Sequence, residues 1–175
     1  MAVVNTVDDV LTHPTTAGEL GGARLLSSSR VIDIAAADSD LSVFLMGEVP
    51  DIAVIESIEF ECTDITGGTS FSVGLYDVDG TVIDDNCFAD AVDFSSISGL
   101  PLGPHGVAIR QLMSAVSIAN ANKKVYEHAG HVNKTYPGSG ETQKKSKYRI
   151  GLKATTIGSE AVTGLAIIKY RIVNG

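Results

Sequence analysis

The sequence is poor in the residues that build sugar-binding platforms, disulfide frameworks and membrane spans. It has no tryptophan, aromatic residues make up 6%, and there are two cysteines among 175 residues. Few rings argue against a sugar platform, and two cysteines cannot form a disulfide scaffold. No apolar run approaches the roughly 20 residues of a membrane-spanning helix, so we expect no membrane contact. A chain of this length instead fits one globular domain with its own core.

The first residues also lack the features of a secretory signal. Met-Ala-Val-Val-Asn has neither the basic start nor the apolar centre of a signal peptide. We therefore expect synthesis and folding in the cytoplasm, where Cys62 and Cys87 stay reduced. Cys62 falls on the inward phase of an alternating run, which predicts that its thiol fills the core.

Motifs for catalysis and nucleotide binding are missing as well. The sequence contains no Gly-x-Ser-x-Gly nucleophile elbow, and Gly138-x-Gly140 lacks the lysine and helix that follow in a phosphate loop. His128 and His131 are three residues apart, but no third metal ligand lies near them in the sequence. We therefore predict no enzyme activity, no catalytic residue, no cofactor and no metal site at these histidines.

Acidic residues around one turn resemble part of a calcium loop. Residues 77–80 match its D-x-D-G centre, but the first and twelfth ligand positions hold Leu75 and Asn86. Without those two oxygen ligands the calcium pattern fails. The remaining alternative is a looser oxygen site made by Asp77, Asp79, Asp84 and Asp85.

The net charge of −8 hides two halves of opposite sign. Residues 1–100 hold 2 basic and 18 acidic side chains, whereas residues 101–175 hold 11 basic and 3 acidic ones. One interpretation is internal: basic C-terminal strands lie beside acidic N-terminal strands, and each pair contributes about 0.2–1 kcal/mol. The other is that a basic and an acidic face dock copies or partners. A chain with a pI near 4.8 is repelled by phosphate backbones, so we predict no nucleic-acid partner.

Alternating residues in the centre of the chain predict half-buried strands. Apolar residues alternate with acidic ones from Ile58 to Cys62, and with small ones from Phe71 to Leu75 after a Gly67-Gly68 turn. The Asp79-Gly80 pair then marks a tight hairpin. We predict that these strands pair in order as an antiparallel meander. Their outward side chains Glu59 and Glu61 are expected to face the basic C-terminal strands or an adjoining subunit.

Further strands are predicted on both sides of this centre. Residues 24–34 and 41–45 form two strands by the same pattern, and residues 148–152 and 166–172 form a second hairpin with a basic outer face. Residues 86–98 lose the alternation and are predicted to lack regular structure. With about seven or eight strands, the chain is predicted to be all-β, and an antiparallel β-sandwich is favoured over a barrel.

One or two short helices are predicted between residues 107 and 130. The spacing favours a helix over residues 107–116, and a shorter one over residues 123–129 ends at Gly130. Residues 134–146 are polar and are predicted to be the most exposed and mobile segment. The aromatic rings expected to point outward are Tyr76, Tyr126 and Tyr136.

Residues 1–23 have no sustained periodicity and are interpreted as an extended N-terminal arm, followed by a single β-sandwich domain over residues 24–175. Such a segment is usually a frayed terminus. Its valines are uncommon in disordered segments, so ordering against a neighbouring subunit is the alternative. The slightly positive mean hydropathy of the chain is consistent with surface buried against other subunits.

Several stretches carry a resemblance to a known group of proteins. They are SFSVGLYD and DGTVIDD within residues 70–85, IANANKKVYEHAG over residues 118–130, YRIGLKATT over residues 148–156, and the final strand from residue 164 to 173. Over roughly residues 30–175 the chain resembles small virion structural proteins of tailed bacteriophages. That group includes capsid decoration, or cement, proteins with jelly-roll-like sandwiches. The resemblance therefore implies a jelly-roll-like fold and an assembly role, and it supplies no active-site residues.

The implied function is that of a non-enzymatic virion protein, made in the cytoplasm of a host bacterium, that binds and stabilises the lattice of the major capsid protein. We expect a homo-oligomer that contacts the capsid protein or other virion subunits. The candidate contacts are valines of the arm and lysines of the basic half: Val3, Val4, Val7, Lys123, Lys124, Lys144, Lys145 and Lys147. The alternative is a carbohydrate- or receptor-binding module at the tail.

Overall fold

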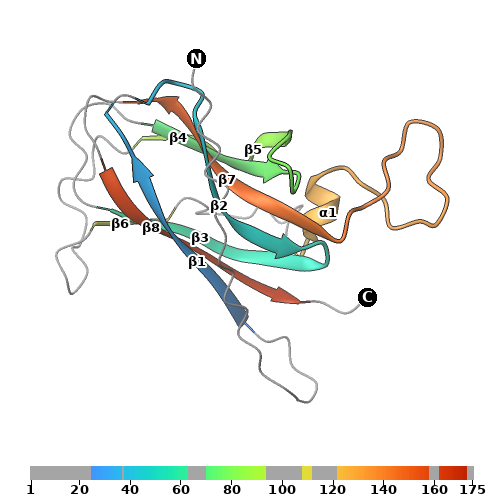
Figure 1. Cartoon of the computed structure of the whole chain (residues 1–175). Coiled ribbons are helices and arrows are strands. Elements are labelled where there is room, and N and C mark those ends of the chain that lie inside the picture. The colour runs from blue at the N-terminus through green and yellow to red at the C-terminus, as the bar shows by residue number, and fades with distance from the viewer. Residues whose placement is uncertain are drawn as a thin grey trace.

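The computed structural model describes residues 25–36, 38–62, 70–93, 108–111, 122–157 and 162–172, and it forms two antiparallel four-stranded sheets (Figure 1). One sheet has the strand order β1-β8-β3-β6, and the other has the order β2-β7-β4-β5. The elements are β1 (Leu25–Ile34), β2 (Val43–Pro50), β3 (Ala53–Cys62), β4 (Ser70–Tyr76), β5 (Val82–Asp93), β6 (Ala108–Gln111), α1 (Val125–His128), β7 (Lys147–Thr156) and β8 (Val162–Ile172).

The pairing of the strands defines a jelly roll. β1 pairs with β8, β2 with β7, β3 with β6 and β4 with β5, as if one long hairpin had been rolled up. The additional pairs β3–β8 and β4–β7 join these hairpin pairs into the two sheets. Eight strands in two sheets with this double Greek-key order are a jelly roll, so the predicted all-β sandwich is confirmed.

The core lies between the two sheets and follows the alternation seen in the sequence. Inward side chains of β1, β2, β3, β4, β7 and β8 form one buried cluster that includes Ile32, Met46, Ile58, Phe60, Phe71, Leu75, Ile150 and Ile168. Cys62 is buried among them, as predicted. Each fully buried large apolar side chain contributes about 1.5–3 kcal/mol, so this shared core holds the sheets together.

Two predicted strand pairings are wrong because the partners lie in different sheets. β3 pairs with β6 and β8 and does not pair with β4, so the central strands do not form a meander, although β4 and β5 do form the predicted hairpin. In the same way β7 pairs with β2 and β4, while β8 pairs with β1 and β3, so the predicted C-terminal hairpin is absent. Alternation identifies a strand, but both sheets of a sandwich produce the same alternation.

Two predictions for the irregular regions also need correction. Residues 86–93 belong to β5, whose register against β4 shifts three times, and these bulges are what disrupts the alternation. Residues 108–111 form β6 rather than part of a helix over residues 107–116, because they pair with β3. Helix α1 is the predicted short helix, and Gly130 has the positive φ of a helix end (φ 66). In the described part of the chain, no helix is long and apolar enough to span a membrane.

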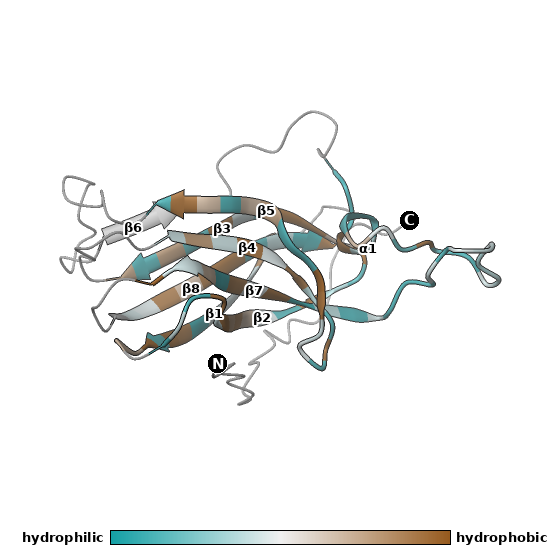
Figure 2. Cartoon of the chain, turned by 90° about the horizontal axis from the view of Figure 1, so that it is seen from above, coloured by the Kyte–Doolittle hydropathy of each residue, from teal (hydrophilic) through white to brown (hydrophobic). Residues whose placement is uncertain are grey.

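The edge strands lie in pairs at opposite sides of the sandwich. Figure 2 shows β1 and β2 along one side and β5 and β6 along the other, in agreement with the two strand orders. The turns β2–β3 and β4–β5, helix α1 and the loop of residues 131–146 are joined by contacts at one end of the molecule.

Candidate attachment surface

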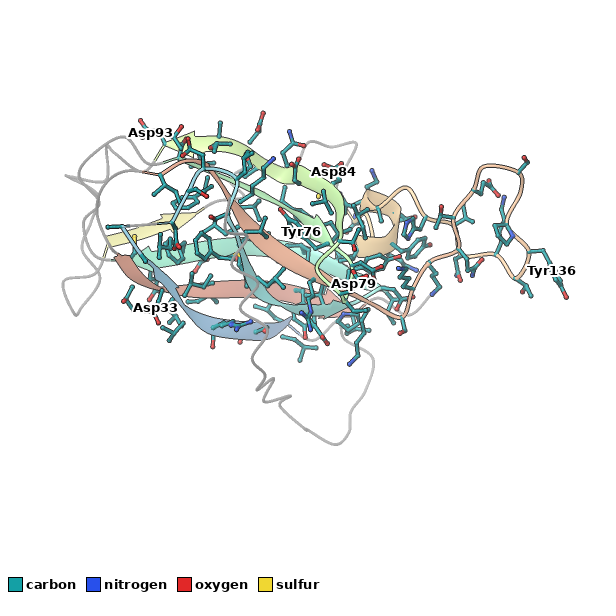
Figure 3. The ribbon with its side chains drawn as sticks, turned by 45° about the horizontal axis from the view of Figure 1, so that its top comes forward. Asp33, Tyr76, Asp79, Asp84, Asp93 and Tyr136 are labelled. Atoms are coloured by element: carbon teal, nitrogen blue, oxygen red, sulfur yellow. The ribbon has the colours of Figure 1, made fainter. Side chains whose placement is uncertain are left out.

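The loop of residues 131–146, between α1 and β7, projects from one end of the sandwich (Figure 1). Its two arms are joined where the Val132 N–H donates to Thr142 (2.9 Å) and the Lys144 N–H donates to Val132 (3.0 Å). Tyr136 lies at the far end of the loop with 88% of its surface exposed (Figure 3). The predicted exposure of this segment and of the Tyr136 ring is confirmed.

The tip of the loop is shaped by one glutamate. The Glu141 carboxylate accepts the Gly138 N–H at 2.6 Å and pairs with the Lys134 ammonium at 3.2 Å. The hydrogen bond from Gly138 is the main reason that the pKa of Glu141 lies below its usual value. These bonds hold the turn around Pro137, the residue that follows Tyr136.

The base of the loop is fastened to the core through Tyr148, which is buried at the start of β7. Its hydroxyl accepts the Lys145 N–H at 3.0 Å and lies 2.6 Å from Nδ1 of His131. Because this hydroxyl already accepts one proton, it is placed to donate its own proton to a neutral imidazole. Burial, with a further contribution from Lys145, lowers the pKa of His131 and so favours that neutral form.

Three of the predicted contact lysines come together at this end, but each is paired with an acid of the same chain. Lys144 pairs with Asp51 of the β2–β3 turn, Lys145 pairs with Asp77 after β4, and Lys147 lies 3.5 Å from Glu48. The Lys144 ammonium also lies 5.3 Å from the centre of the Tyr126 ring. The hydrogen bond to Asp77 is the main cause of a raised pKa at Lys145.

Lys123 and Lys124 precede α1 at the same end of the molecule and are half-buried. Within the described residues neither side chain has an ion pair. The backbone N–H of Lys124 donates to the Glu127 carboxylate at 2.6 Å, which orients the start of the helix. The predicted arm contacts Val3, Val4 and Val7 lie outside the described residues.

His128 is packed against Phe88 of β5. Its ring lies 5.1 Å from the ring of Phe88, and burial is the main cause that lowers its pKa to about 4. His131 is used by Tyr148, as described above. Among the described residues no group of three or more His, Cys, Asp or Glu side chains is arranged to hold a metal ion.

The acidic residues near the β4–β5 turn each have an internal role. Asp77 accepts the Val78 N–H at 2.7 Å, and Asp79 accepts the Thr81 N–H at 2.9 Å, which lowers the pKa of Asp79. Asp84 caps the Asn86 N–H at 3.3 Å, and Asp85 pairs with Lys153 of β7. These contacts are those of a turn stabilised by its own side chains.

The opposite charges of the two halves of the chain pair across the sheets. Seven ion pairs join a basic residue after position 100 to an acid before it, as in Lys169–Glu59 at 2.8 Å and Arg149–Glu48 at 3.3 Å. The internal interpretation of the charge pattern is confirmed, and so is the outward Glu59 facing a basic strand. Glu61 lies half-buried opposite Leu165 and has no ion pair within the described part of the chain.

The prediction that the Tyr76 ring points outward to solvent is wrong, and the Tyr126 ring is partly buried against the core rather than exposed. Tyr76 is fully buried with Val43 and Leu45 in a small cluster separate from the main core. A Cβ atom on Gly151 would lie 2.6 Å from its ring, so the ring rests directly on that backbone. Tyr76 follows the inward Leu75 and therefore points to the outer side of its sheet. The ring is nevertheless buried on that side. The local sequence pattern does not predict this burial.

The fold is similar to that of a solved viral capsid chain. It matches a chain of the capsid of Ralstonia phage GP4 with a TM-score of 0.51 and 12% identity, over 92% of this chain and 93% of that chain. The fold is shared with a phage capsid chain. The predicted resemblance to phage virion proteins is therefore confirmed at the level of the fold, over nearly the whole length of both chains.

Other similar structures align less closely. A chain of the cyanophage Pam1 capsid asymmetric unit gives a TM-score of 0.45 at 10% identity, over 97% of this chain and 100% of that chain. A chain of infectious bursal disease virus, Gx strain, gives 0.41 at 10% identity, over 97% of this chain and 37% of that chain. No family model and no curated protein matches the sequence.

Proposed function

We propose that this chain is a non-enzymatic structural protein of a bacteriophage particle, and that it acts as a decoration protein on the major capsid protein lattice. The observation that carries the proposal is the jelly roll itself, shared along almost its whole length with a chain of the Ralstonia phage GP4 capsid. The residues that sequence motifs would nominate for catalysis or metal binding are used instead in turns, ion pairs and core contacts.

The core and the ion pairs formed within the single chain support a decoration role over a shell-forming role. Its core is closed between its own two sheets, and its basic strands are neutralised by its own acids. The exposed large apolar residues of the described part are scattered over strands and turns. A subunit of this kind can fold alone and then be added to a lattice that has already formed.

The projecting loop is the proposed attachment element. It extends beyond the sandwich, its tip is fixed by Glu141, and it ends in the exposed ring of Tyr136. Fixed aromatic side chains are effective contacts, because they bury a large area and lose little conformational entropy on binding. Lys123 and Lys124 lie at the same end without ion pairs among the described residues, so they are the lysines most available to an acidic partner.

The decisive experiment is to delete the gene from the phage that encodes the chain. A decoration protein predicts that particles still assemble, that they lose heat resistance, and that purified protein added back restores it and occupies regular sites in electron micrographs. Complete failure of shell assembly would instead identify the chain as the shell-forming capsid protein. Normal particles that never bind the added protein would refute both roles.

The contact residues are tested by binding of variants to particles that lack the protein. Lys123→Gln with Lys124→Gln is expected to reduce occupancy at low salt and to have less effect at high salt, since exposed charges are screened. The triple change of Lys144, Lys145 and Lys147 to Gln also breaks internal pairs, so its effect includes a loss of stability. Lys153→Gln, which faces Asp85, is the control. Equal losses at all salt concentrations would contradict a charge-based contact.

The arm has its own test. Deletion of residues 2–20 is expected to weaken particle binding while the isolated protein keeps its melting temperature. Unchanged occupancy would remove Val3, Val4 and Val7 from the proposed contact.

One observation favours the second candidate, a receptor-binding module at the tail. A projecting loop with an exposed aromatic tip is also suited to stack on a sugar ring. A glycan array decides between the two: specific hits that disappear with Tyr136→Ala would favour the tail module, while no hits, together with particle binding that depends on Tyr136, would favour decoration.

A further inference from the structure

Three of the four edge strands carry features that prevent pairing with another strand. β2 contains a bulge between Leu45 and Gly47 and ends in Pro50, which has no N–H to donate. β5 shifts register three times against β4 and carries four aspartates. β6 is only four residues long. Bulges, charges, proline and short length are the devices by which proteins protect sheet edges.

β1 has almost none of these features. It pairs with β8 in continuous register over all ten residues, from Leu25 opposite Arg171 to Ile34 opposite Val162, without a bulge. Its sequence, LLSSSRVIDI, has no proline and no lysine, and the two charges lie in its second half. Among the named strands, β8 is its only partner in the sheet order. Among the described residues, no strand pairs with the other edge of β1, so this edge is a straight row of backbone donors and acceptors.

β1 also carries two exposed apolar side chains on one face. Leu25 and Val31 are each 60% exposed, and both lie on the outer face of the sheet together with Ser27 and Ser29. A further strand added beside this edge would bury both side chains.

We infer that β1 pairs antiparallel with β1 of a second copy of this chain, across a two-fold axis at Ser28, and joins two four-stranded sheets into one of eight strands. In this register Leu25 of each copy lies opposite Val31 of the other, and Ser27 lies opposite Ser29. The two exposed apolar residues therefore cover each other, and the small Ser28 side chains meet at the axis. The contact is isologous and closes, which limits further growth of the sheet.

Neighbouring registers are less favourable. With the axis at Ser29, Leu25 faces the Asp33 carboxylate of the other copy. With the axis at Arg30, two guanidinium groups lie directly opposite each other, which is destabilising. With the axis at Val31, the two Val31 side chains meet but Leu25 stays exposed. If the two-fold axis passed between two residues, each outward side chain of one copy would lie opposite an inward side chain of the other. This register is excluded because side chains alternate between the two faces of a sheet.

The pairing makes a specific prediction for cysteine cross-linking in the full-length protein. Opposite positions on antiparallel strands bring Cβ atoms close enough for a disulfide. An equimolar mixture of Ser27→Cys and Ser29→Cys is expected to form a covalent dimer under mild oxidation, whereas each variant alone stays monomeric under denaturing, non-reducing conditions. Cross-linking through the two native cysteines is expected to be low. Cys62 is buried, and burial raises the pKa of the Cys87 thiol to about 12.

Controls separate this register from chance collision. Val82→Cys, similarly exposed on β5 at the opposite edge, is expected not to cross-link. A dimer formed by Ser29→Cys alone or by Val31→Cys alone would overturn the proposed register. No dimer in the Ser27→Cys and Ser29→Cys mixture, at concentrations where Val82→Cys is equally unreactive, would overturn the pairing.

The non-covalent measurement uses sedimentation across a concentration series. The unmodified chain is expected to show a monomer–dimer equilibrium, and Val31→Lys is expected to raise the dissociation constant about tenfold or more by setting a charge opposite Leu25. Val82→Lys is the matched control and should leave dimerisation unchanged. If Val31→Lys has no effect and deletion of residues 2–20 abolishes association, the arm mediates it and the β1 pairing is wrong.

Discussion

β1 and β5 are long edge strands of ten and twelve residues that lie at opposite sides of the sandwich. β1 runs straight beside β8, while β5 bends repeatedly against β4 and carries Asp84, Asp85, Asp90 and Asp93. An irregular edge offers no continuous ladder to a neighbour, and a straight one does. Within the described part of the chain, the edge at β5 is therefore protected against sheet extension and the edge at β1 is not.

The irregular path of β5 follows from its close contacts with Ser72 and Gly74 of β4. A Cβ atom on Gly74 would lie 2.2 Å from the Asp85 carbonyl carbon, so the β5 backbone crosses where only glycine fits. The Ser72 hydroxyl, buried on the same face, accepts the Ala91 N–H at 3.0 Å and donates to Asp90 at 3.1 Å. Ala91 itself has a positive φ of 45°. Gly74, Ser72 and Ala91 therefore shape the irregular edge formed by β5.

Gly74→Ala is expected to have the largest effect on this comparison. The added methyl group must displace the backbone at Asp84 and Asp85, so we expect a loss of about 2–3 kcal/mol in the free energy of unfolding. Urea denaturation measures it, with Val82→Ala as an exposed control on β5 that should change stability by less than about 0.5 kcal/mol. Equal stability of Gly74→Ala and the unmodified chain would mean that β5 does not press on β4.

Ser72→Ala is expected to have the next largest effect. It removes the hydroxyl that holds the bulge at Asp90 and Ala91, which should cost about 1–2 kcal/mol. Ser27→Ala makes the same change on the exposed face of β1 and should stay within about 0.5 kcal/mol. Equal losses in the two variants would argue against a bulge that depends on its own hydrogen bonds.

Low pH is expected to lower the free energy of unfolding gradually, through protonation of His128 beside β5. The pKa of His128 falls from 6.5 in the unfolded chain to about 4 when the ring is buried against Phe88. The unfolded chain therefore binds this proton first, so stability is full above about pH 6.5 and declines as the pH falls toward 4. His128→Gln should flatten the dependence of the urea midpoint on pH in that window. An unaltered pH profile would assign the acid sensitivity to other groups.

Ala91→Gly is expected to have the smallest effect, and of opposite sign. Glycine relieves the positive φ at this bulge but costs more conformational entropy, so we expect a gain of about 0.5 kcal/mol. Ala89→Gly, in the same strand without a positive φ, should instead lose about 0.5–1 kcal/mol. A loss at both positions would show that the bulge is not strained.

Much of the fold could be predicted because local alternation reports burial directly. The inward phases of residues 58–62, 71–75 and 148–152 match the buried cluster, and the outward Glu59 meets Lys169. The polar loop around Tyr136 and the short helix before Gly130 were also predictable, since turn residues and a helix end have local signatures.

The attachment surface was predictable only in part. Lys144, Lys145 and Lys147 do gather at one end, but their ion pairs depend on contacts between segments that are distant in the sequence. Lys144 and Lys145 meet Asp51 and Asp77 of two other turns, and Lys147 meets Glu48 because β7 pairs with β2. The burial of Tyr76 was missed for a similar reason, because its alternation points it outward and only the folded chain covers that side.

The sequence by itself determined the strands whose side chains alternate regularly, the inward phase of those strands, and that the two halves of the chain carry complementary charge. Those properties follow from a period of two residues and from composition, which need no knowledge of neighbours in space. The sequence did not identify β6 or the second half of β5 as strands. Only the tertiary structure decided that β3 and β4 lie in different sheets and that β1, rather than β5, is the regular edge. Strand partners in a jelly roll are far apart along the chain, so their pairing is selected by packing of the whole core and leaves no local pattern.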